Sequence, residues 1–419
     1  MKFVGKETTP VKVPGMPIIK VIGLGGGGGN AVDYMVRSEV KDVEFICANT
    51  DAQALDNSEA KVCIQLGAGG LGAGADPERG KQSAKENIDQ VKEQLKDTDM
   101  VFITAGMGGG TGTGSAPVVA QAAREMGILT VGVVSRPFSF ERRNKIADQG
   151  ILDLQEHVDS LIVVPNDKLL KVLGKDFVLA KAFDYANEVL HGGVQGISEL
   201  VTRPGIINVD FEDLRTVMGE RGMAMMGVGY ATGDERALKA TQKAIANPLL
   251  EDISVSGAKG LLVNITSGLD FTLGEFNEVG DAIDLVAAPD ARVIIGTSID
   301  ESMNDEIRVT VVATGLNQAS KPELVKPNLQ GVQANKADQV AAVSEPSINI
   351  APVPTPASVP SPPQESIQSK SVEMMQQPEL SLAEPEVVRK ATVNGVDSVT
   401  SMSNSSYLDI PAFLRRQAD

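Results

Sequence analysis

The sequence is poor in the residues that build metal centres and disulfide frameworks. It has no tryptophan, two histidines and two cysteines among 419 residues. Cys47 and Cys63 show no metal-like spacing to each other or to His157 and His191, so neither a zinc site nor a disulfide framework is indicated. We expect both cysteines to be buried as small hydrophobic side chains.

Long apolar runs are also missing. No stretch approaches the length of a membrane span, and residues 1–7 lack the apolar core of a signal peptide, so the chain is expected to stay in the cytoplasm. A net charge of −17 opposes nonspecific binding to nucleic acid or to anionic lipid. Any association with a membrane would therefore need an adaptor.

Glycine, in contrast, is abundant, and it is concentrated at two places. Residues 106–115 read GMGGGTGTGS, between a strand-like run at 100–105 and a helical pattern from Pro117 to Met126. Such a loop lets backbone N–H groups converge on an anion, and the following helix adds its partial positive charge. A flexible surface turn is the alternative, but it would rarely interleave two threonines and a serine between a strand and a helix. The pattern predicts a phosphate site.

A second glycine run, at 25–29, follows a strand pattern at 18–24. The spacing G-x-G-x-x-G of a dinucleotide-binding fold occurs there, and Asp51 is placed to read a ribose, so an NAD-dependent enzyme is one alternative. The glycines that meet this spacing are Gly23, Gly25 and Gly28. A dinucleotide enzyme has no need of the second, larger loop, whereas a nucleoside triphosphate held between several strand-to-helix loops does. No G-x-x-x-x-G-K-[ST] sequence is present, which disfavours a P-loop NTPase.

The octapeptide GGGTGTGS at 108–115 resembles the signature of the tubulin and FtsZ superfamily of GTPases. Six further stretches narrow the resemblance to the bacterial FtsZ family, and they recur in order from about residue 17 to 316 and again near the C-terminus. They are GGGGGNAV at 25–32, NTDAQAL at 49–55, RPFSFE at 136–141, PNDKLL at 165–170, NVDFEDLRTVM at 208–218 and DIPAFLRRQ at 409–417. The resemblance implies a self-assembling GTPase that forms the cytokinetic ring under the inner membrane in bacterial cell division.

The alternation of strand and helix patterns predicts an α/β fold, with a doubly wound parallel-sheet GTP-binding domain joined by a long central helix to a smaller α+β domain. Strand candidates lie at 18–23, 43–48, 100–105, 128–134, 160–164, 223–231, 259–266, 292–297 and 307–314. The expected boundaries are an N-terminal extension at 1–16, the GTP-binding domain at 17–177, the central helix at 178–202, a catalytic loop and following helix at 203–222, the α+β domain at 223–316, a linker at 317–404 and a C-terminal peptide at 405–419.

The linker and the peptide differ in composition. Residues 317–404 contain no aromatic residue and about half of the 22 prolines, which predicts a disordered tether. The terminal peptide regains an apolar face flanked by arginines, suited to a partner groove, although a solvated tail is the simpler alternative. The resemblance implies that this peptide binds membrane-tethering division proteins of the FtsA or ZipA type. Its expected contact residues are Leu408, Asp409, Ile410, Pro411, Phe413, Leu414 and Arg415.

The resemblance also implies a set of contacts to GTP or GDP, with Mg²⁺ held mainly through the phosphates. Glu141 falls at the ribose position, Lys145 where the family usually has an arginine, and Phe183 and Asn187 at the base. The other implied contacts are Gly26, Gly27, Gly28, Gly29, Asn30, Gly108, Gly109, Gly110, Thr111, Gly112, Thr113, Gly114 and Asn166. Gly29 stands where an asparagine is usual, Arg142 where a glycine is usual, and residues 67–76 resemble a shortened loop that senses the γ-phosphate.

Asn208, Asp210 and Asp213 are the candidate catalytic residues. Two aspartates three positions apart are also the spacing of a helix N-cap and its third residue, so capping is the alternative reading. In the family, this segment reaches the nucleotide of the next subunit, where the carboxylates polarise the attacking water and the amide positions it. A monomer would then hold GTP without completing its site, and head-to-tail contacts would build filaments. A GTP-binding polymer-former without significant hydrolysis is the competing function.

Overall fold

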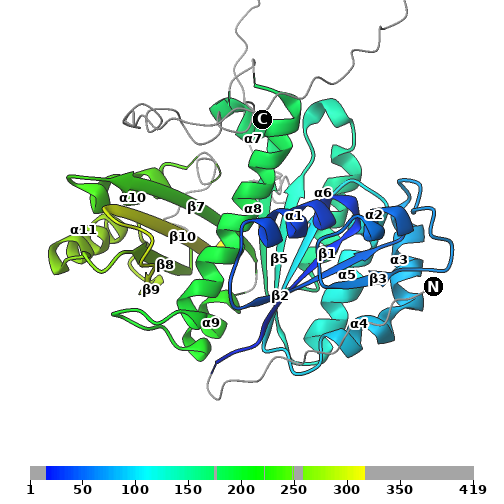
Figure 1. The fold of residues 1–419 in the computed structure, drawn as a ribbon, viewed down its shortest axis with the longest axis horizontal. Coiled ribbons are helices and arrows are strands. Elements are labelled where there is room, and N and C mark those ends of the chain that lie inside the picture. The colour runs from blue at the N-terminus through cyan, green and yellow to red at the C-terminus, as the bar shows by residue number, and fades with distance from the viewer. Residues whose placement is uncertain (1–15, 174–176, 221, 248, 250–257, 317–419) are drawn as a thin grey trace, which may run out of the picture. The chain divides into compact units, whose positions relative to one another are not determined.

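A computed structural model describes residues 16–173, 177–220, 222–247, 249 and 258–316. Ten strands of this part of the chain form one sheet, in the order β3-β2-β1-β4-β5-β6-β7-β10-β8-β9 (Figure 1). The strands are β1 (Ile19–Leu24), β2 (Val43–Asn49), β3 (Val62–Gln65), β4 (Met100–Gly106), β5 (Leu129–Arg136), β6 (Ser160–Pro165), β7 (Met223–Thr232), β8 (Gly260–Ser267), β9 (Arg292–Ile299) and β10 (Glu306–Leu316). All the predicted strands are present, and β3 is one that the sequence analysis missed.

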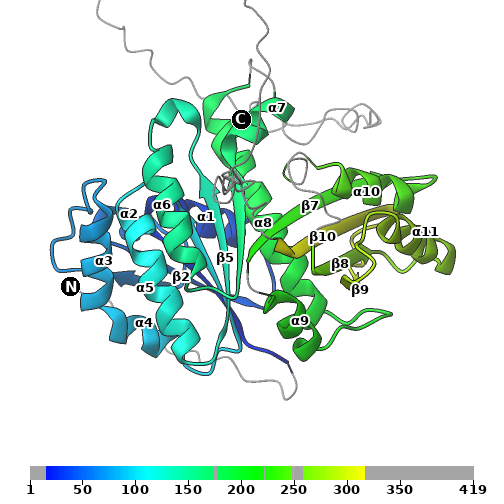
Figure 2. The ribbon, with the colours of Figure 1, turned by 180° about the vertical axis from the view of Figure 1, so that it is seen from behind.

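The first six strands run parallel, and helices pack on both of their faces (Figures 1 and 2). Successive residues of one strand enter different cores: Val21 packs in the cluster that contains helices α1 and α8, whereas Ile22 packs with α5 and α6 on the other side. A strand buried on both faces must be apolar at every position, which is why these strands read as continuous hydrophobic runs. The predicted doubly wound α/β class is confirmed.

The helices of this half, with those that follow it, are α1 (Gly25–Arg37), α2 (Ala52–Asp56), α3 (Pro77–Glu86), α4 (Ile88–Gln94), α5 (Thr111–Glu125), the short 3₁₀ helix η1 (Ser139–Glu141), α6 (Asn144–Gln155), α7 (Asn166–Leu173), α8 (Leu179–Thr202) and α9 (Phe211–Met218). The long helix α8 corresponds to the helix predicted at 178–202. It links the parallel part of the sheet to the remaining strands.

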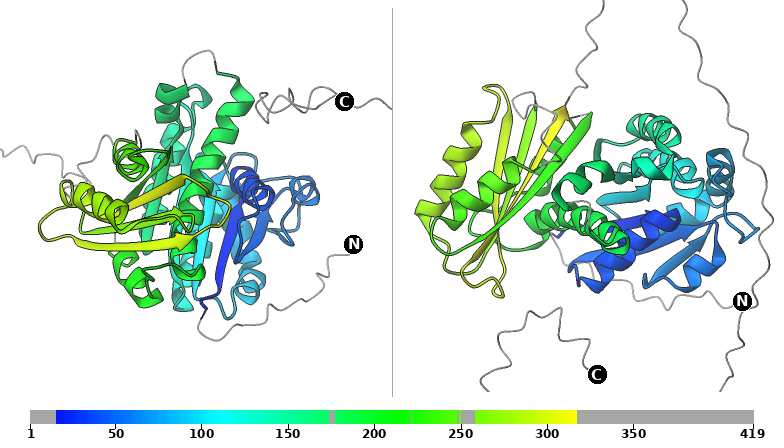
Figure 3. Two further views of the ribbon diagram at one scale, coloured as in Figure 1. Left: turned by 60° about the vertical axis from the view of Figure 1, so that its left-hand side comes forward. Right: turned by 90° about the horizontal axis from the view of Figure 1, so that it is seen from above.

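The remaining strands form the predicted α+β part. Strand β10 pairs antiparallel with both β7 and β8, and β9 adds to β8 in parallel at the edge of the sheet. Helices α10 (Arg236–Ile245) and α11 (Leu273–Asp284) cover one face, where they bury a third apolar core (Figure 3). The other face receives α8, since the side-chain amide of Asn264 on β8 donates to the carbonyl of Gly196 at 3.0 Å.

The first glycine run is helical from Gly25, whereas residues 107–110 of the second form the predicted turn after β4; the sequence interpretation was wrong about where the two helices begin. Helix α1 begins at Gly25 and α5 at Thr111, six residues before Pro117. The glycines are there for close packing: a Cβ on Gly28 would lie 2.3 Å from the carbonyl oxygen of Thr104, and one on Gly114 would lie 1.9 Å from that of Pro77. Any side chain at these positions would force the helices away from their neighbours.

Three predictions concern segments that are only partly described. Apart from Met16, the N-terminal extension at 1–16, the linker at 317–404 and the peptide at 405–419 lie outside the described residues.

Among the described residues, no helix has both the length and the apolarity needed to cross a bilayer. Cys47 is buried as expected, and burial raises the pKa of its thiol to about 12, whereas Cys63 is only half-buried.

Candidate active site

Two helix N-termini meet at the carboxyl edge of the parallel strands. Helix α1 starts directly after β1, and α5 starts five residues after β4 ends. Their first turns touch, since a Cβ on Gly25 would lie 2.8 Å from the backbone nitrogen of Gly112. Neither helix has a side-chain cap or an acidic residue in its first turn. Two uncapped, positively polarised helix ends with free N–H groups form a strong site for an anion such as a phosphate.

The predicted phosphate contacts divide into exposed and buried positions. Gly26 faces open space, with no atom within 4 Å of where its Cβ would be, and Gly27 and Asn30 are exposed beside it. Gly109 is half-buried, and the nearest atom to a Cβ there would be 3.9 Å away. These positions leave the backbone accessible to a ligand.

The buried positions support the turn from within. Thr113 is 4% exposed, and its hydroxyl accepts a hydrogen bond from the backbone N–H of Gly108 at 2.8 Å. Gly112 and Gly114 are buried against backbone. Thr111 is half-buried, and its hydroxyl lies 2.6 Å from that of Thr50. Sequence reasoning missed Thr50, although its position just after β2, at the same sheet edge, was a usable signal.

The loop at 67–76 packs against the start of α5. Backbone N–H of Gly72 donates to the carbonyl of Thr50 at 3.0 Å, and a Cβ on Gly110 would lie 2.7 Å from the nitrogen of Asp76. Four of its glycines, at 67, 70, 72 and 74, have positive φ, a conformation that other residues rarely adopt. Leu71 at its tip is 94% exposed. The loop therefore borders the helix ends, as expected for one that contacts a terminal phosphate.

Glu141 pairs with Arg143, a basic residue that the sequence analysis did not single out. Its carboxylate accepts hydrogen bonds from the backbone N–H of Phe138 at 2.9 Å and from the guanidinium of Arg143. The Arg143 side chain also packs on Gly108; both Arg143 and Lys145 are exposed, and Lys145 lies in the first turn of α6. The chain reaches Arg143 through Arg142, which has a left-handed φ of 56° where the family usually has glycine. No spacing rule distinguishes Arg143 from Lys145, so the pair between Glu141 and Arg143 is found only in the folded chain, and the nucleotide contact of Lys145 stays a prediction.

Aromatic and amide side chains lie at the same edge, at the start of α8 and α7. The Phe183 ring meets Phe138 edge-on at 5.3 Å between centroids and is 40% exposed. Asn187, one helical turn later, is half-buried. Asn166 is 4% exposed, and its side-chain oxygen has no hydrogen-bond partner in the described part of the chain. A buried acceptor without a donor is costly, and a purine ring that presents N–H groups would satisfy it.

Asp51 is already engaged. It is the N-cap of α2, and its carboxylate accepts from the backbone N–H groups of Gln53 and Ala54 at 3.0 and 3.4 Å. A cap serves the local helix, so the reading of Asp51 as the ribose contact of a dinucleotide fold loses its support.

Asn208 and Asp210 lie on the loop between α8 and α9, and Asp213 lies in the first turn of α9. Asp210 is the N-cap of α9, where its carboxylate accepts from the backbone N–H of Asp213 at 2.7 Å, and the side-chain oxygen of Asn208 accepts from that of Gly205 at 2.8 Å. The capping alternative is therefore real for Asp210. Asp213 is exposed, and its carboxylate has no partner among the described residues. All three side chains face solvent.

Within one chain, this loop is far from the glycine turns. Helix α8 has 24 residues and so is about 36 Å long (Figure 1). Phe183 lies in its second turn, and the loop follows its last residue. At that end, Arg215 of α9 donates to the carbonyl of Gly127 at 3.4 Å, and Gly127 precedes β5 at the amino edge of the parallel strands. The structure thus brings the nucleotide candidates together and leaves the catalytic candidates at the opposite edge.

Comparisons with known proteins agree with this architecture. A family model described as the GTPase domain of the tubulin/FtsZ family matches residues 18–174, and one described as the C-terminal domain of the FtsZ family matches residues 222–317. The cell division protein FtsZ of Pseudomonas putida is 52% identical over 97% of this chain and 98% of its own length. That of Coxiella burnetii is 58% identical over 74% of this chain and 81% of its own length.

Solved structures give the same result. An empty FtsZ dimer from M. jannaschii superposes with a TM-score of 0.68 at 41% identity, over 71% of this chain and 88% of that one. The GDP-bound CetZ1 monomer of Haloferax volcanii shares the fold, with a TM-score of 0.63 at 20% identity over 72% of this chain and 95% of its own. The chain therefore belongs to the FtsZ family of tubulin-like cell division GTPases.

Proposed function

We propose that this protein assembles head to tail and hydrolyses GTP at each contact, with the nucleotide held by one molecule and the catalytic loop supplied by the next. The observation that carries this proposal is the separation of the two half-sites by the length of α8. Neither half is complete alone, and opposite ends of one molecule join into a continuing row. The M. jannaschii relative described as an FtsZ dimer supports self-association.

The residues divide into three groups by role. Backbone N–H groups in the first turns of α1 and α5 bind the phosphates. Glu141 with Arg143 or Lys145 contacts the ribose, and Asn166, Phe183 and Asn187 contact the guanine. Phosphoryl transfer depends mainly on placing water in line and stabilising charge. In the next molecule, Asp210 and Asp213 polarise this water and Asn208 orients it for attack on the γ-phosphorus, and the bond to the β-phosphate oxygen breaks to give GDP and phosphate.

Mg²⁺ supplies neutralisation of phosphate charge when bound. The ion would be held chiefly by the nucleotide phosphates; within the described ranges no three metal-ligating side chains are grouped. The Asp213 carboxylate, which has no hydrogen bond or ion pair to any described residue, is available to a water molecule.

The cellular role extends this proposal. The assembled protein forms a cytoplasmic ring under the inner membrane, and its C-terminal peptide at 405–419 binds membrane-tethering proteins of the FtsA or ZipA type. The net charge of −17 supports attachment through such adaptors rather than through direct contact with anionic lipid. The linker at 317–404 and the other boundaries given above divide the chain between assembly and attachment.

A GTP-binding polymer-former without hydrolysis is the second candidate. The capping role of Asp210 favours it, because one of the carboxylates then has a structural reason to be present. The Asp213 carboxylate opposes it, since no described residue bonds to that carboxylate and the dipole of α9 is the one structural role left for it.

GTP turnover per molecule across a protein dilution series with Mg²⁺, recorded together with light scattering, tests the proposal. Turnover should appear only above the concentration at which scattering begins. Asp213→Ala should retain GTP binding and scattering but lose most turnover, whereas Glu212→Ala, one residue away on the same exposed turn, should retain it. Turnover that is constant at every concentration would show that the site is complete in one chain.

A further inference from the structure

Strand β9 holds the loop that carries the catalytic candidates. We infer that Thr297 on β9, assisted by the ion pair between Arg203 and Asp300, is a positioning residue that sets the pose of Asn208 and Asp210 for the neighbouring molecule. The inference rests on the proposed function, in which this loop lies over the nucleotide of the next molecule. It names the residues that hold the loop in place.

The loop between α8 and α9 pairs with the free edge of β9, much as an added strand would. Strand β9 pairs with β8 on one side only, so its other edge has unpaired backbone groups. The loop takes these places: the N–H of Thr297 donates to the carbonyl of Ile207 at 2.9 Å, and the N–H of Ile299 donates to that of Pro204 at 3.3 Å. Two backbone hydrogen bonds hold the loop along the strand. Any residue could form them, so they do not depend on a particular side chain.

Thr297 adds such a side chain. Its hydroxyl accepts a hydrogen bond from the backbone N–H of Ile207 at 2.8 Å, so together with its own N–H it binds both backbone groups of that residue. Asn208 is the next residue, and its side-chain oxygen is fixed by Gly205. Gly205 in turn lies flat on the strand, since a Cβ there would stand 1.7 Å from the carbonyl oxygen of Thr297. Thr297 thus contacts the loop on both sides of its central turn.

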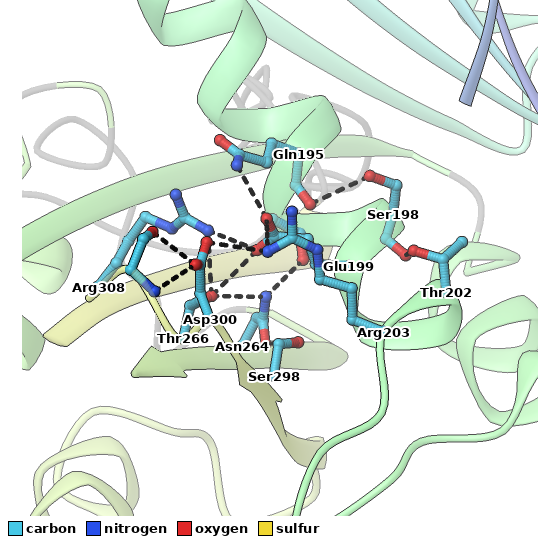
Figure 4. A network of polar contacts seen from close by, with 12 residues as sticks. Gln195, Ser198, Glu199, Thr202, Arg203, Asn264, Thr266, Ser298, Asp300 and Arg308 are labelled. Carbon is cyan, nitrogen blue, oxygen red and sulfur yellow. Dashed lines mark hydrogen bonds and ion pairs between the residues drawn. The ribbon is translucent and has the colours of Figure 1, made fainter. Parts of the chain in front are cut away.

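The ion pair anchors the start of the loop. Arg203, the C-cap of α8, places its guanidinium 3.0 Å from one carboxylate oxygen of Asp300, directly after β9, and 3.3 Å from Glu199 (Figure 4). Hydrogen bonds from Ser302, and then from Arg203, lower the pKa of Asp300 to about 2, so the pair stays charged at neutral pH. The polar cluster in Figure 4 continues from Glu199 to Arg308 on β10.

These contacts affect turnover because the loop acts on the nucleotide of the neighbouring molecule, far from the nucleotide bound by its own molecule. Its GTP lies at the other end of α8, so loosening the loop leaves nucleotide binding by the same molecule unaffected. The in-line position of the water on the neighbour depends on the loop, and small misplacements of a catalytic group cost large factors in rate. A positioning role therefore predicts a loss in kcat with an unchanged affinity for GTP.

Thr297→Val keeps the shape of the side chain and removes the hydroxyl. We expect kcat in assembled samples to fall about 10-fold, with GTP affinity and the concentration at which scattering begins unchanged. Thr297→Ser keeps the hydroxyl and should restore turnover to near the wild-type rate. Thr241→Val is the matched control, because the Thr241 hydroxyl is buried and bonds only to Ala237 in its own helix. Asp300→Asn is the second variant, and it should lower kcat in the same selective way.

Each result decides between the alternatives. Wild-type kcat in both Thr297→Val and Asp300→Asn, with Asp213→Ala inactive, would overturn the positioning role and leave the proposed function standing. An equal loss in Thr297→Ser and Thr297→Val would also overturn it, because the hydroxyl would then be irrelevant. If Thr297→Val fails to assemble, kcat of Asp300→Asn decides alone. Wild-type turnover by Asp213→Ala would instead overturn the proposed function itself.

Discussion

At the scale of single residues, the half-buried His191 is a pH-sensitive group. It lies on α8 with its ring edge-on to Tyr34, 5.8 Å between centroids, and its Nε2 has no hydrogen-bond partner among the described residues. Burial, together with the nearby charge of Arg308, lowers the pKa of His191 to about 4, although Glu199 acts in the opposite direction. The folded protein therefore holds His191 neutral.

The consequence is a loss of stability in mild acid. The unfolded chain binds a proton at His191 below pH 6.5, whereas the folded chain binds it only near pH 4, so the free energy of unfolding should fall across this window by about 3 kcal/mol. His191→Phe, which keeps a ring beside Tyr34, should flatten that part of the profile. Urea unfolding from pH 7 to pH 4 measures it, with His157→Phe as the control. A wild-type profile without this slope would contradict the assignment.

At the scale of elements, the start of α9 allows the two roles of the Asp210 carboxylate, capping the helix and activating water, to be tested separately. Asp210 caps this helix through the backbone N–H of Asp213. Asn is as good an N-cap as Asp, and Ala is a poor one. Asp210→Ala should therefore lose about 1 kcal/mol of stability and most turnover, while Asp210→Asn should keep the stability and still lose turnover. Thermal unfolding and GTP hydrolysis by the same samples distinguish the roles, and full activity in Asp210→Asn would leave Asp210 as a cap alone.

The elements also show how far the sequence could lead. Apolar runs such as β1 and β4 are visible because each of their residues is buried, and the long pattern of α8 is equally clear. Strand β3 has only four residues, two of them Cys63 and Gln65, and gives no comparable signal. The starts of α1 and α5 were misread because glycine normally disfavours helix, and the backbone contacts that require it here come from distant parts of the chain, Thr104 of β4 for Gly28 and Pro77 of α3 for Gly114. Thr297 reaches Ile207, 90 positions earlier in the chain, and Arg143 packs on Gly108, so only tertiary contacts place these side chains beside those segments.

At the scale of the whole molecule, the two half-sites define a direction. The glycine turns lie at the carboxyl edge of the parallel strands, and the loop with Asn208 and Asp210 lies at the amino edge. A contact between unlike ends does not close on itself, so each added molecule completes one site and offers another. In the proposed function, hydrolysis takes place at the contact between two molecules, so it can be expected to act on the contact itself.

This arrangement predicts that two inactive variants restore each other. Gly109→Asp places a negative charge at the phosphate site, where a side chain has room, and should abolish GTP binding. Asp213→Ala binds GTP but offers no effective loop. In mixed filaments at equal amounts, about a quarter of contacts join a good loop to a loaded nucleotide, so turnover should recover to about that fraction of wild type. A mixture of Asp213→Ala with the double variant carrying both changes is the control and should stay inactive. If residues are shared across the contact, the loop of one variant serves the nucleotide of the other. A mixture of the two single variants that is no more active than either variant alone would therefore contradict a shared site.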